Sequence, residues 1–275
     1  MKSILVHLDA SPRSAIRLAI GQSLARRHGA ELSVLYGVVP SMLACTWGAA
    51  EGMAVAAPMF ADIDREQLSR ARSTFEAAAV PGERMTWIDG GSTPHLSLTR
   101  RAPYADLIVV GQFDSRDPLT GGLPPEHVSA TITDTGKPTL IVPCEGAVDD
   151  AQPRRIVVGW KPTREAARAV ACGLPWLRGA TDVHIGSRQE EDSSGPDDAA
   201  SLKHWLQLHG VTARLHTHPL DSGDAGVRLL ALAAHTGADM LVMGCYGHSR
   251  AREWVLGGAS HTVLNAMSLP VLMAH

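Results

Sequence analysis

Short apolar runs alternate with segments of helical periodicity along the chain of 275 residues. Runs of consecutive apolar residues predict strands, and apolar residues that recur every three or four positions predict helices. The predicted strands cover 3–9, 31–38, 84–88, 105–111, 138–143, 155–160, 181–186, 211–218, 239–244 and 270–274. After a first helix that follows the first strand, the predicted helices cover 63–79, 93–102, 125–135, 164–178, 198–209, 223–236 and 257–267. Uninterrupted apolar strands separated by helices are typical of an α/β fold whose parallel sheet is covered on both faces.

The first helix shows recognisable start and stop signals. Ser11 is predicted to cap its N-terminus, and Pro12 to occupy its first position. Gly29 is predicted to end it, because glycine adopts the left-handed conformation that often follows a helix. The sequence therefore predicts that a helix begins directly after the first strand.

Segments of the first half return in the second half. An Ala-Asp-x4-Gly strand and a closing Pro-x-Leu strand each occur twice with nearly the same spacing, and the two opening strands also resemble each other. The matching segments are 105–111 with 238–244, 137–143 with 269–275, and 4–11 with 156–163. This repeat predicts two tandem domains, 1–145 and 154–275, joined by a stretch rich in Gly, Asp, Gln and Pro.

The first half carries an insertion, because its opening strand lies further from its counterpart than the other matching segments do. We place it at 40–60, which has no counterpart in the second half and which contains Met42, Met53, Met59, Trp47 and Phe60. Three interpretations stay open: a mobile apolar lid over the cleft of the first half, a surface for a partner, and a loop packed on its own domain.

Composition and charge exclude several classes. The 25 Lys and Arg are outnumbered by 28 Asp and Glu, and a net charge of −3 argues against a general nucleic-acid binder. The longest weakly polar stretch, 38–60, is interrupted by Pro40, Glu51 and Pro58 and is not a membrane span. The N-terminus has too short an apolar run for a signal peptide. We therefore expect a cytoplasmic protein that does not associate with membranes.

Cysteine and histidine do not form recognisable metal sites. The four cysteines lie far apart without zinc-ligand spacing, which favours structural thiols in a reducing compartment: Cys45, Cys144, Cys172 and Cys245. Among the 13 histidines, His216 and His218 share one face of a predicted strand, close in sequence to His204 and His209. No carboxylate or cysteine completes a ligand pattern there, so solvated or capping histidines are favoured and no metal is expected.

The segment 244–260 carries the most informative chemistry. It joins a buried strand to a helix and contains Gly244, Gly247 and Gly257. Glycines let a phosphate approach the backbone, and the helix start offers unpaired N–H groups and the positive end of a dipole. Ser249 and Ser260 add hydroxyl donors. These residues predict an anion site, although a glycine-rich turn without a ligand explains them equally well.

The spacing Gly244-x2-Gly247-x9-Gly257 is similar to the nucleotide-binding signature of the universal stress protein family, and the two repeated strand motifs resemble the same family. The resemblance covers nearly the whole chain as two tandem copies. It implies two doubly wound, five-stranded parallel-sheet domains of the adenine nucleotide α-hydrolase-like type, with strand order 3-2-1-4-5. It also implies a ligand outside the carboxyl ends of strands 1 and 4, halves that pack through their last strands as a pseudo-dimer, and a homodimer of two chains as a further option.

In ATP-binding members of the family, an Asp after strand 1 holds the adenosine end, and the glycine loop and a following Ser or Thr hold the phosphates. Carried over, the resemblance implies ATP, with or without Mg²⁺, or another adenine nucleotide as the ligand of the C-terminal domain. At the Asp position stands Lys161, which accepts no hydrogen bond but can pair with a phosphate. The implied phosphate site consists of Gly244, Gly247, His248, Ser249, Gly257, Gly258, Ala259 and Ser260.

The first half shows the opposite pattern. Asp9 matches the acidic residue of the family, but Asp114 replaces the second glycine of the loop. Pro125 and Glu126 stand where the second half has Gly257 and Gly258. Proline removes an N–H group and glutamate adds negative charge, so both disfavour an anion. We interpret the first half as a degenerate copy with a structural or regulatory role.

No Ser-His-Asp set, paired carboxylates or Walker-type lysine stands at a strand-to-helix turn, so an enzyme is the weaker class. The predicted function is a stress-response protein that binds a small-molecule nucleotide or phosphate in its C-terminal domain and acts as a sensor or regulator. Two alternatives remain: a ligand-free interaction scaffold with vestigial clefts, and a slow ATP hydrolase.

Overall fold

The computed structural model describes residues 1–44, 50–91, 93–117, 123–146, 152–188, 198–218, 223–245 and 258–275. The chain forms two compact units, Met1–Lys137 and Pro138–His275, called unit 1 and unit 2 below. The boundary between the units precedes the last strand of the first repeat, so that strand is grouped with unit 2. The domain limits 1–145 and 154–275 stay a prediction about the two repeats.

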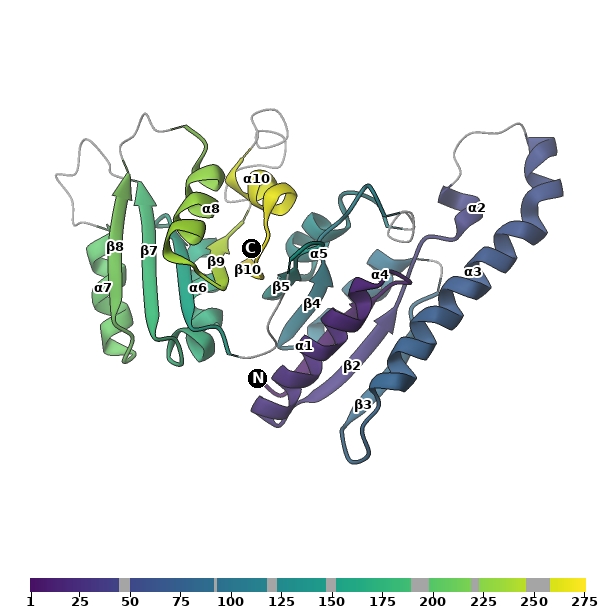
Figure 1. Ribbon diagram of the computed structural model, residues 1–275, viewed down its shortest axis with the longest axis horizontal. Helices are drawn as coiled ribbons and strands as arrows, with labels where there is room; N and C mark the ends of the chain where they lie inside the picture. Colours follow the sequence, from purple (N-terminus) through teal and green to yellow (C-terminus); the bar gives the residue numbers. More distant parts are fainter. Residues whose placement is uncertain are drawn as a thin grey trace. The chain divides into compact units, whose positions relative to one another are not determined.

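Unit 1 contains a parallel sheet in the order β3-β2-β1-β4. The helices α1 and α3 contact each other, as do α4 and α5 (Figure 1). Right-handed crossovers place these two pairs on opposite faces, because the chain reverses its direction across the sheet after β3. The elements are β1 (Ser3–Leu8), α1 (Arg13–His28), β2 (Glu31–Tyr36), α2 (Ser41–Ala44), α3 (Ala50–Ala78), β3 (Met85–Asp89), α4 (Pro94–Arg101), the 3₁₀ helix η1 (Ala102–Tyr104), β4 (Leu107–Gly111) and α5 (His127–Thr135).

Unit 2 contains the sheet order β8-β7-β6-β9-β10-β5. Its first five strands are parallel and repeat the order 3-2-1-4-5, whereas β5 pairs antiparallel with β10 through Ile141 and Val271. The elements are β5 (Thr139–Val142), β6 (Arg155–Trp160), α6 (Arg164–Leu177), β7 (Asp182–Arg188), α7 (Asp198–Leu208), β8 (Ala213–His218), α8 (Ala225–Thr236), β9 (Met240–Gly244), α10 (Ala259–Ala266) and β10 (Val271–Ala274). The predicted doubly wound α/β fold is confirmed.

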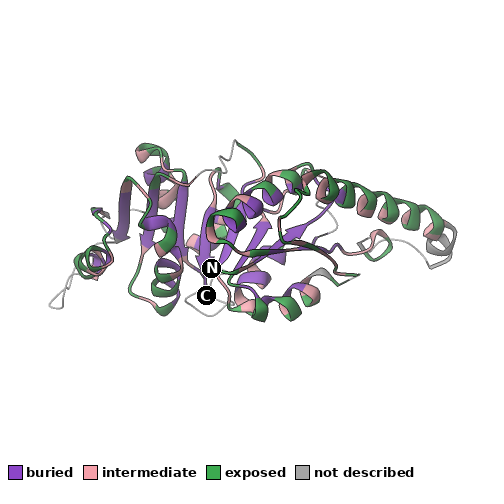
Figure 2. Ribbon diagram, turned by 90° about the horizontal axis from the view of Figure 1, so that it is seen from below, coloured by how far each residue is buried: buried purple, intermediate pink, exposed green. Residues whose placement is uncertain are grey.

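The described part of the insertion in the first half forms helix at 41–44 and from Ala50 onward, rather than loop. The helix predicted to begin at 63 begins at Ala50 instead, and α3 is 29 residues long with Pro58 inside it. Its N-terminal part extends past the ends of the strands in both views (Figures 1 and 2). Residues 45–49, which include Trp47, lie outside the described part. The interpretation as a loop is therefore wrong for the described part of 40–60, while the roles as a lid or a partner surface stay predictions.

The start of α1 differs from the prediction, and its end agrees with it. Gly29 has φ 56°, ψ 45° and donates its N–H to the last turn of the helix. At the other end the N-cap residue is Pro12, and no side chain caps the helix there. The hydroxyl of Ser11 donates instead to the carboxylate of Asp9. The prediction that Ser11 caps α1 is wrong because the buried carboxylate lies closer to its hydroxyl.

The core of each unit lies between its sheet and its helices. The inner strands are buried, the edge strand β3 is only partly buried, and the outward faces of the helices are exposed (Figure 2). The cost of burying strand residues such as Val6, Ile108, Val157 and Val242 is small, because they are apolar and their backbone groups pair within the sheet. No helix among the described residues has the length and apolar character needed to cross a membrane.

Candidate functional site

The carboxyl edge of the unit 2 sheet brings several of the predicted site residues together. β6 and β9 are neighbours, with Gly159 opposite Met243, so Lys161 after β6 and Gly244 at the end of β9 lie at the same edge. Because α10 connects β9 to β10, two parallel neighbours, its N-terminus also belongs to this edge. The two halves of the predicted ligand site therefore meet where a doubly wound sheet binds its ligands.

The N-terminus of α10 offers backbone donors. Its N-cap is Gly258, with φ −65° and ψ 157°, which has no side chain to accept a hydrogen bond from the first turn. The first intrahelical N–H is that of Thr262, which donates to the Gly258 carbonyl. The N–H groups at the start of a helix have no acceptor within the helix and, with the helix dipole, favour a bound anion. Gly247, His248, Ser249 and Gly257 lie outside the described residues, and their role stays a prediction.

Gly244 has a packing role that the sequence did not reveal. A Cβ at this position would lie 2.4 Å from the backbone nitrogen of Ala166 and 2.7 Å from the carbonyl carbon of Glu165. The first turn of α6 therefore packs directly on the end of β9. The next residue, Cys245, is buried and its thiol donates to the Ala274 carbonyl at 3.4 Å. This contact fits the structural thiol that the sequence predicted.

Glu165 is a buried acid at this edge that sequence reasoning missed. It is 3% exposed and lies in the first turn of α6, where the helix dipole favours negative charge. Burial raises the pKa of Glu165, but hydrogen bonds from Arg164 and Thr163 outweigh burial and leave this pKa below its usual value. The sequence feature that could have identified Glu165 is its position as an acidic residue in the first turn of α6, just after the N-cap residue Thr163.

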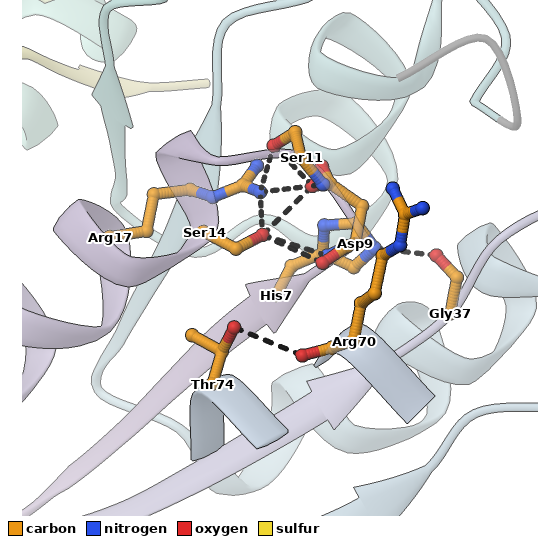
Figure 3. Close-up of polar contacts among 8 residues, drawn as sticks. All are labelled: His7, Asp9, Ser11, Ser14, Arg17, Gly37, Arg70 and Thr74. Carbon is orange, nitrogen blue, oxygen red and sulfur yellow. Dashed lines mark hydrogen bonds and ion pairs between the residues drawn. The ribbon is translucent and has the colours of Figure 1, made fainter. Parts of the chain in front are cut away.

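In unit 1 the carboxylate of Asp9 is fully buried and already has a cation. Arg17 reaches it from α1, with Nη2 2.6 Å from Oδ1 (Figure 3). The Ser11 backbone N–H and the Ser14 hydroxyl donate to the same oxygen at 2.9 and 2.8 Å. Burial raises the pKa of Asp9, but the Arg17 charge and its hydrogen bond outweigh burial and hold the pKa well below its usual range. The adenosine-binding role predicted for Asp9 would have to compete with this ion pair.

The guanidinium of Arg17 lies where only glycine leaves room for it. A Cβ on Gly111, at the end of β4, would lie 2.1 Å from Arg17 Nη1. The glycine that ends the strand in the first repeat therefore accommodates a side chain of the same chain. Sequence reasoning missed Arg17 because a single arginine on a helix gives no sign that it is buried.

Two buried histidines lie beside this ion pair. The Nε2 of His7 is 2.7 Å from the Gly37 carbonyl, and the ring centroids of His7 and His127 are 4.8 Å apart (Figure 3 shows His7). Burial lowers the pKa of His7 to about 4 and, together with the nearby imidazoles, lowers that of His127 well below its usual value. A histidine inside an apolar strand was the sequence signal for His7, and it was overlooked.

The repeats differ where these side chains lie. The sequence alignment of the opening strands sets His7 opposite Gly159 and Arg17 opposite Ala169, and the alignment of the closing strands sets His127 opposite Ala259. These three polar side chains of the first repeat thus correspond to small residues in the second. The internal ion pair of unit 1 has no counterpart at the aligned positions of unit 2.

Histidines also meet elsewhere in unit 2, but not as the sequence suggested. His216 pairs with His184 of the neighbouring strand, with Nε2 and Nδ1 2.9 Å apart. The ring of His209 is tilted by 53° against that of Trp205, with the ring centroids 4.2 Å apart. No group of three or more His, Cys, Asp or Glu side chains in the described part of the chain is arranged to hold a metal ion.

The profile of the universal stress protein family matches residues 152–275. The C-terminal half of the chain belongs to this family. Two curated universal stress proteins, from Mycobacterium tuberculosis and Mycobacterium bovis, are each 27% identical to the chain over 197 residues. The match covers 66% of this chain and 66% of each relative, so the chain spans just under two thirds of their length.

Solved structures extend the likeness in fold to both repeats. A universal stress protein from Archaeoglobus fulgidus has a TM-score of 0.70 at 18% identity and covers 99% of this chain, which covers 95% of it in return. A putative universal stress protein from Pseudomonas aeruginosa has a TM-score of 0.61 at 15% identity, with 100% of this chain and 93% of the other covered. At these identities the likeness shows the fold alone, and it extends over both units.

Proposed function

We propose that the universal stress protein domain of unit 2 binds ATP, or a related nucleotide or phosphate ligand, and that the protein acts as a sensor or regulator. The N-terminus of α10 carries this proposal. It begins at Gly258 without a side-chain cap, at the edge where β6 and β9 end. A phosphate there would accept hydrogen bonds from the first N–H groups of α10 and lie near the positive end of its dipole.

The predicted glycine loop completes this proposed site. Gly247, His248, Ser249 and Gly257 would surround the phosphates, and Ser260, which is 4% exposed, lies in the first turn of α10. The described side chains fit an anion better than they fit a dedicated Mg²⁺ site, since Glu165 already receives a hydrogen bond from Arg164. Any Mg²⁺ would therefore arrive with the phosphates.

For unit 1 we propose a role without a nucleotide. Its acidic residue, Asp9, is neutralised by Arg17, and Gly111 accommodates that arginine. Glu126, the N-cap residue of α5, sets a negative charge where Gly258 stands in unit 2. The antiparallel pairing of β5 with β10 supports an intramolecular pseudo-dimer through the last strands. A homodimer of two chains, and a cytoplasmic location, remain parts of the proposal.

Gly258→Asp is expected to abolish nucleotide binding. The new carboxylate would cap α10 and repel phosphate, so the thermal stabilisation by ATP with magnesium should disappear. For the parent protein this stabilisation is about 2.7 kcal/mol when the ligand exceeds its Kd about 100-fold. Titration calorimetry with ATP, AMP and cyclic dinucleotides measures the same loss directly.

Glu126→Gln is the matched control for this variant, because Glu126 occupies the corresponding position in unit 1. It should bind ATP like the parent protein. Unchanged binding by Gly258→Asp would refute the site. If the parent protein binds no nucleotide but retains partner proteins in pull-downs, the interaction scaffold is favoured. If it releases phosphate from ATP faster than Gly258→Asp does, the slow hydrolase is favoured.

Lys161→Asp should affect the binding of the nucleoside end and of the phosphate end of the ligand in opposite directions. The substitution supplies the acceptor that a nucleoside needs and removes a cation that favours phosphate. We expect adenosine to bind about tenfold more tightly and inorganic triphosphate about tenfold more weakly, which corresponds to about 1.4 kcal/mol each. Lys203→Asp on α7 makes the same charge change and should leave both titrations unaltered. If adenosine gains nothing, Lys161 does not stand at the nucleoside end.

A further inference from the structure

Three imidazoles converge on the face of the unit 1 sheet that α4 and α5 cover. His7 comes from β1, His95 from the first turn of α4, and His127 is the first residue of α5. His7 and His127 are 0% and 2% exposed, and their rings are tilted by 47° at a centroid distance of 4.8 Å. The Nε2 of His95 lies 3.1 Å from a carboxylate oxygen of Asp134, on α5.

The hydrogen bond of His7 shows which of its two ring nitrogens carries a proton. The Nε2 of His7 donates to the Gly37 carbonyl, because a carbonyl oxygen only accepts. Its Nδ1 is then the acceptor nitrogen of a neutral ring, and this atom has no hydrogen-bond partner among the described residues. Neither ring nitrogen of His127 has a partner in that part of the chain either. A second proton on either ring would be buried without an acceptor.

The charges that face these rings do not compensate for this burial. Arg17 of α1 and His95 of α4 disfavour a positive charge on His127, and Arg17 does the same for His7. Asp9 favours a proton on both rings, but its effect on each ring is smaller than that of burial. Asp134 of α5 is engaged with His95. The cluster is therefore stable only while both buried imidazoles are neutral.

We propose that His7 and His127 form an acid-responsive latch in unit 1: they take up protons only when α4 and α5 separate from β1, so acid favours an open form of this unit. The proposal concerns unit 1 and does not rest on nucleotide binding by unit 2. It gives the repeat that lost the nucleotide pattern a regulatory property of its own.

The direction follows from proton linkage. Burial lowers the pKa of His7 to about 4, whereas an exposed histidine has a pKa of about 6.5. The stabilisation by the neutral ring is therefore present above about pH 6.5 and is lost as the pH falls toward about 4. Each histidine multiplies the ratio of open to closed form by up to about tenfold per pH unit, and two multiply it by up to about 100-fold.

Hydrogen exchange of the full chain tests this proposal. Amide exchange is followed by mass spectrometry at about pH 7.5, 6 and 5, with the intrinsic pH dependence of exchange removed. Peptides of β1, α4 and α5 should open with a steep pH dependence below about pH 6. His7→Gln with His127→Leu should abolish this dependence, since glutamine keeps a donor for Gly37. His204→Gln, at an exposed position of α7, should not change it.

A pH dependence that survives in the double variant would overturn the proposal. If the double variant does not fold, imidazole NMR signals of the parent decide. Signals of His7 and His127 that stay neutral while the amides of β1, α4 and α5 remain protected, and charge only as those amides open, support the latch. Signals that titrate near pH 6.5 with these amides still protected would refute it.

Discussion

Arg17→Met is expected to lower the free energy of unfolding of unit 1 by about 3–5 kcal/mol at neutral pH, because it leaves a fully buried carboxylate without its cation. Asp9 is 0% exposed, and Arg17 lies 2.6 Å from its Oδ1. Three serine groups also donate to Asp9, the N–H and the hydroxyl of Ser11 and the hydroxyl of Ser14, but they cannot replace a full positive charge. Urea titration followed by circular dichroism measures the loss.

Two controls separate the ion pair from general damage. Arg26→Met breaks an ion pair with Glu83 whose side chains are 51% and 21% exposed, and it should cost less than about 1 kcal/mol. Adding Asp9→Asn to Arg17→Met should recover much of the lost free energy of unfolding, because the asparagine amide has no charge that would be buried without a cation. If Arg17→Met were as mild as Arg26→Met, the buried pair would not stabilise unit 1.

The acid limb of the stability curve provides a second signature of the same pair. Arg17 holds the pKa of Asp9 well below its usual range in the folded protein. The stabilisation is therefore present above about pH 3.9 and is lost as the pH falls further, because the unfolded chain binds the proton first. In Arg17→Met this part of the acid limb should flatten. The histidine latch acts at higher pH, so the two effects are separable.

Local signals in the sequence were sufficient for the fold. Every predicted strand appears, because a buried parallel strand needs an apolar run and little else. Gly29 ends α1 since its conformation is a property of the residue itself. The internal repeat predicted a tandem organisation, and the family profile matches the second of the two predicted copies, over 152–275.

Long-range partners were what the sequence could not supply. The hydroxyl of Ser11 donates to Asp9 instead of capping the helix, and the carboxylate of Asp9 pairs with Arg17, one turn into α1. The start of α3 at Ala50 depended on a helix that continues through Pro58, which usually breaks one. Spacing in the sequence also cannot distinguish a glycine that makes room for a ligand from a glycine that makes room for a neighbouring segment of the fold.

Gly244→Ala discriminates between these two reasons for a glycine. The added Cβ would lie 2.4 Å from the Ala166 nitrogen, 2.7 Å from the Glu165 carbonyl carbon and 2.8 Å from the Ala166 Cα. These are backbone atoms of the first turn of α6, so no side-chain rotation relieves the contact. We expect unit 2 to lose about 1–3 kcal/mol of stability without any ligand present, as overpacking of a core does.

Gly173→Ala, inside α6, is the matched control, because its Cβ would meet only side-chain methyl groups at 3.3 Å or more and alanine favours a helix. Thermal unfolding of both variants without nucleotide shows whether only Gly244→Ala is destabilised. A Gly244→Ala protein as stable as the parent, but impaired in ATP binding, would reassign this glycine to the phosphates. The expected result assigns Gly244 to the contact between α6 and β9. Gly258→Asp then remains the substitution that we expect to remove ligand binding without disturbing the sheet.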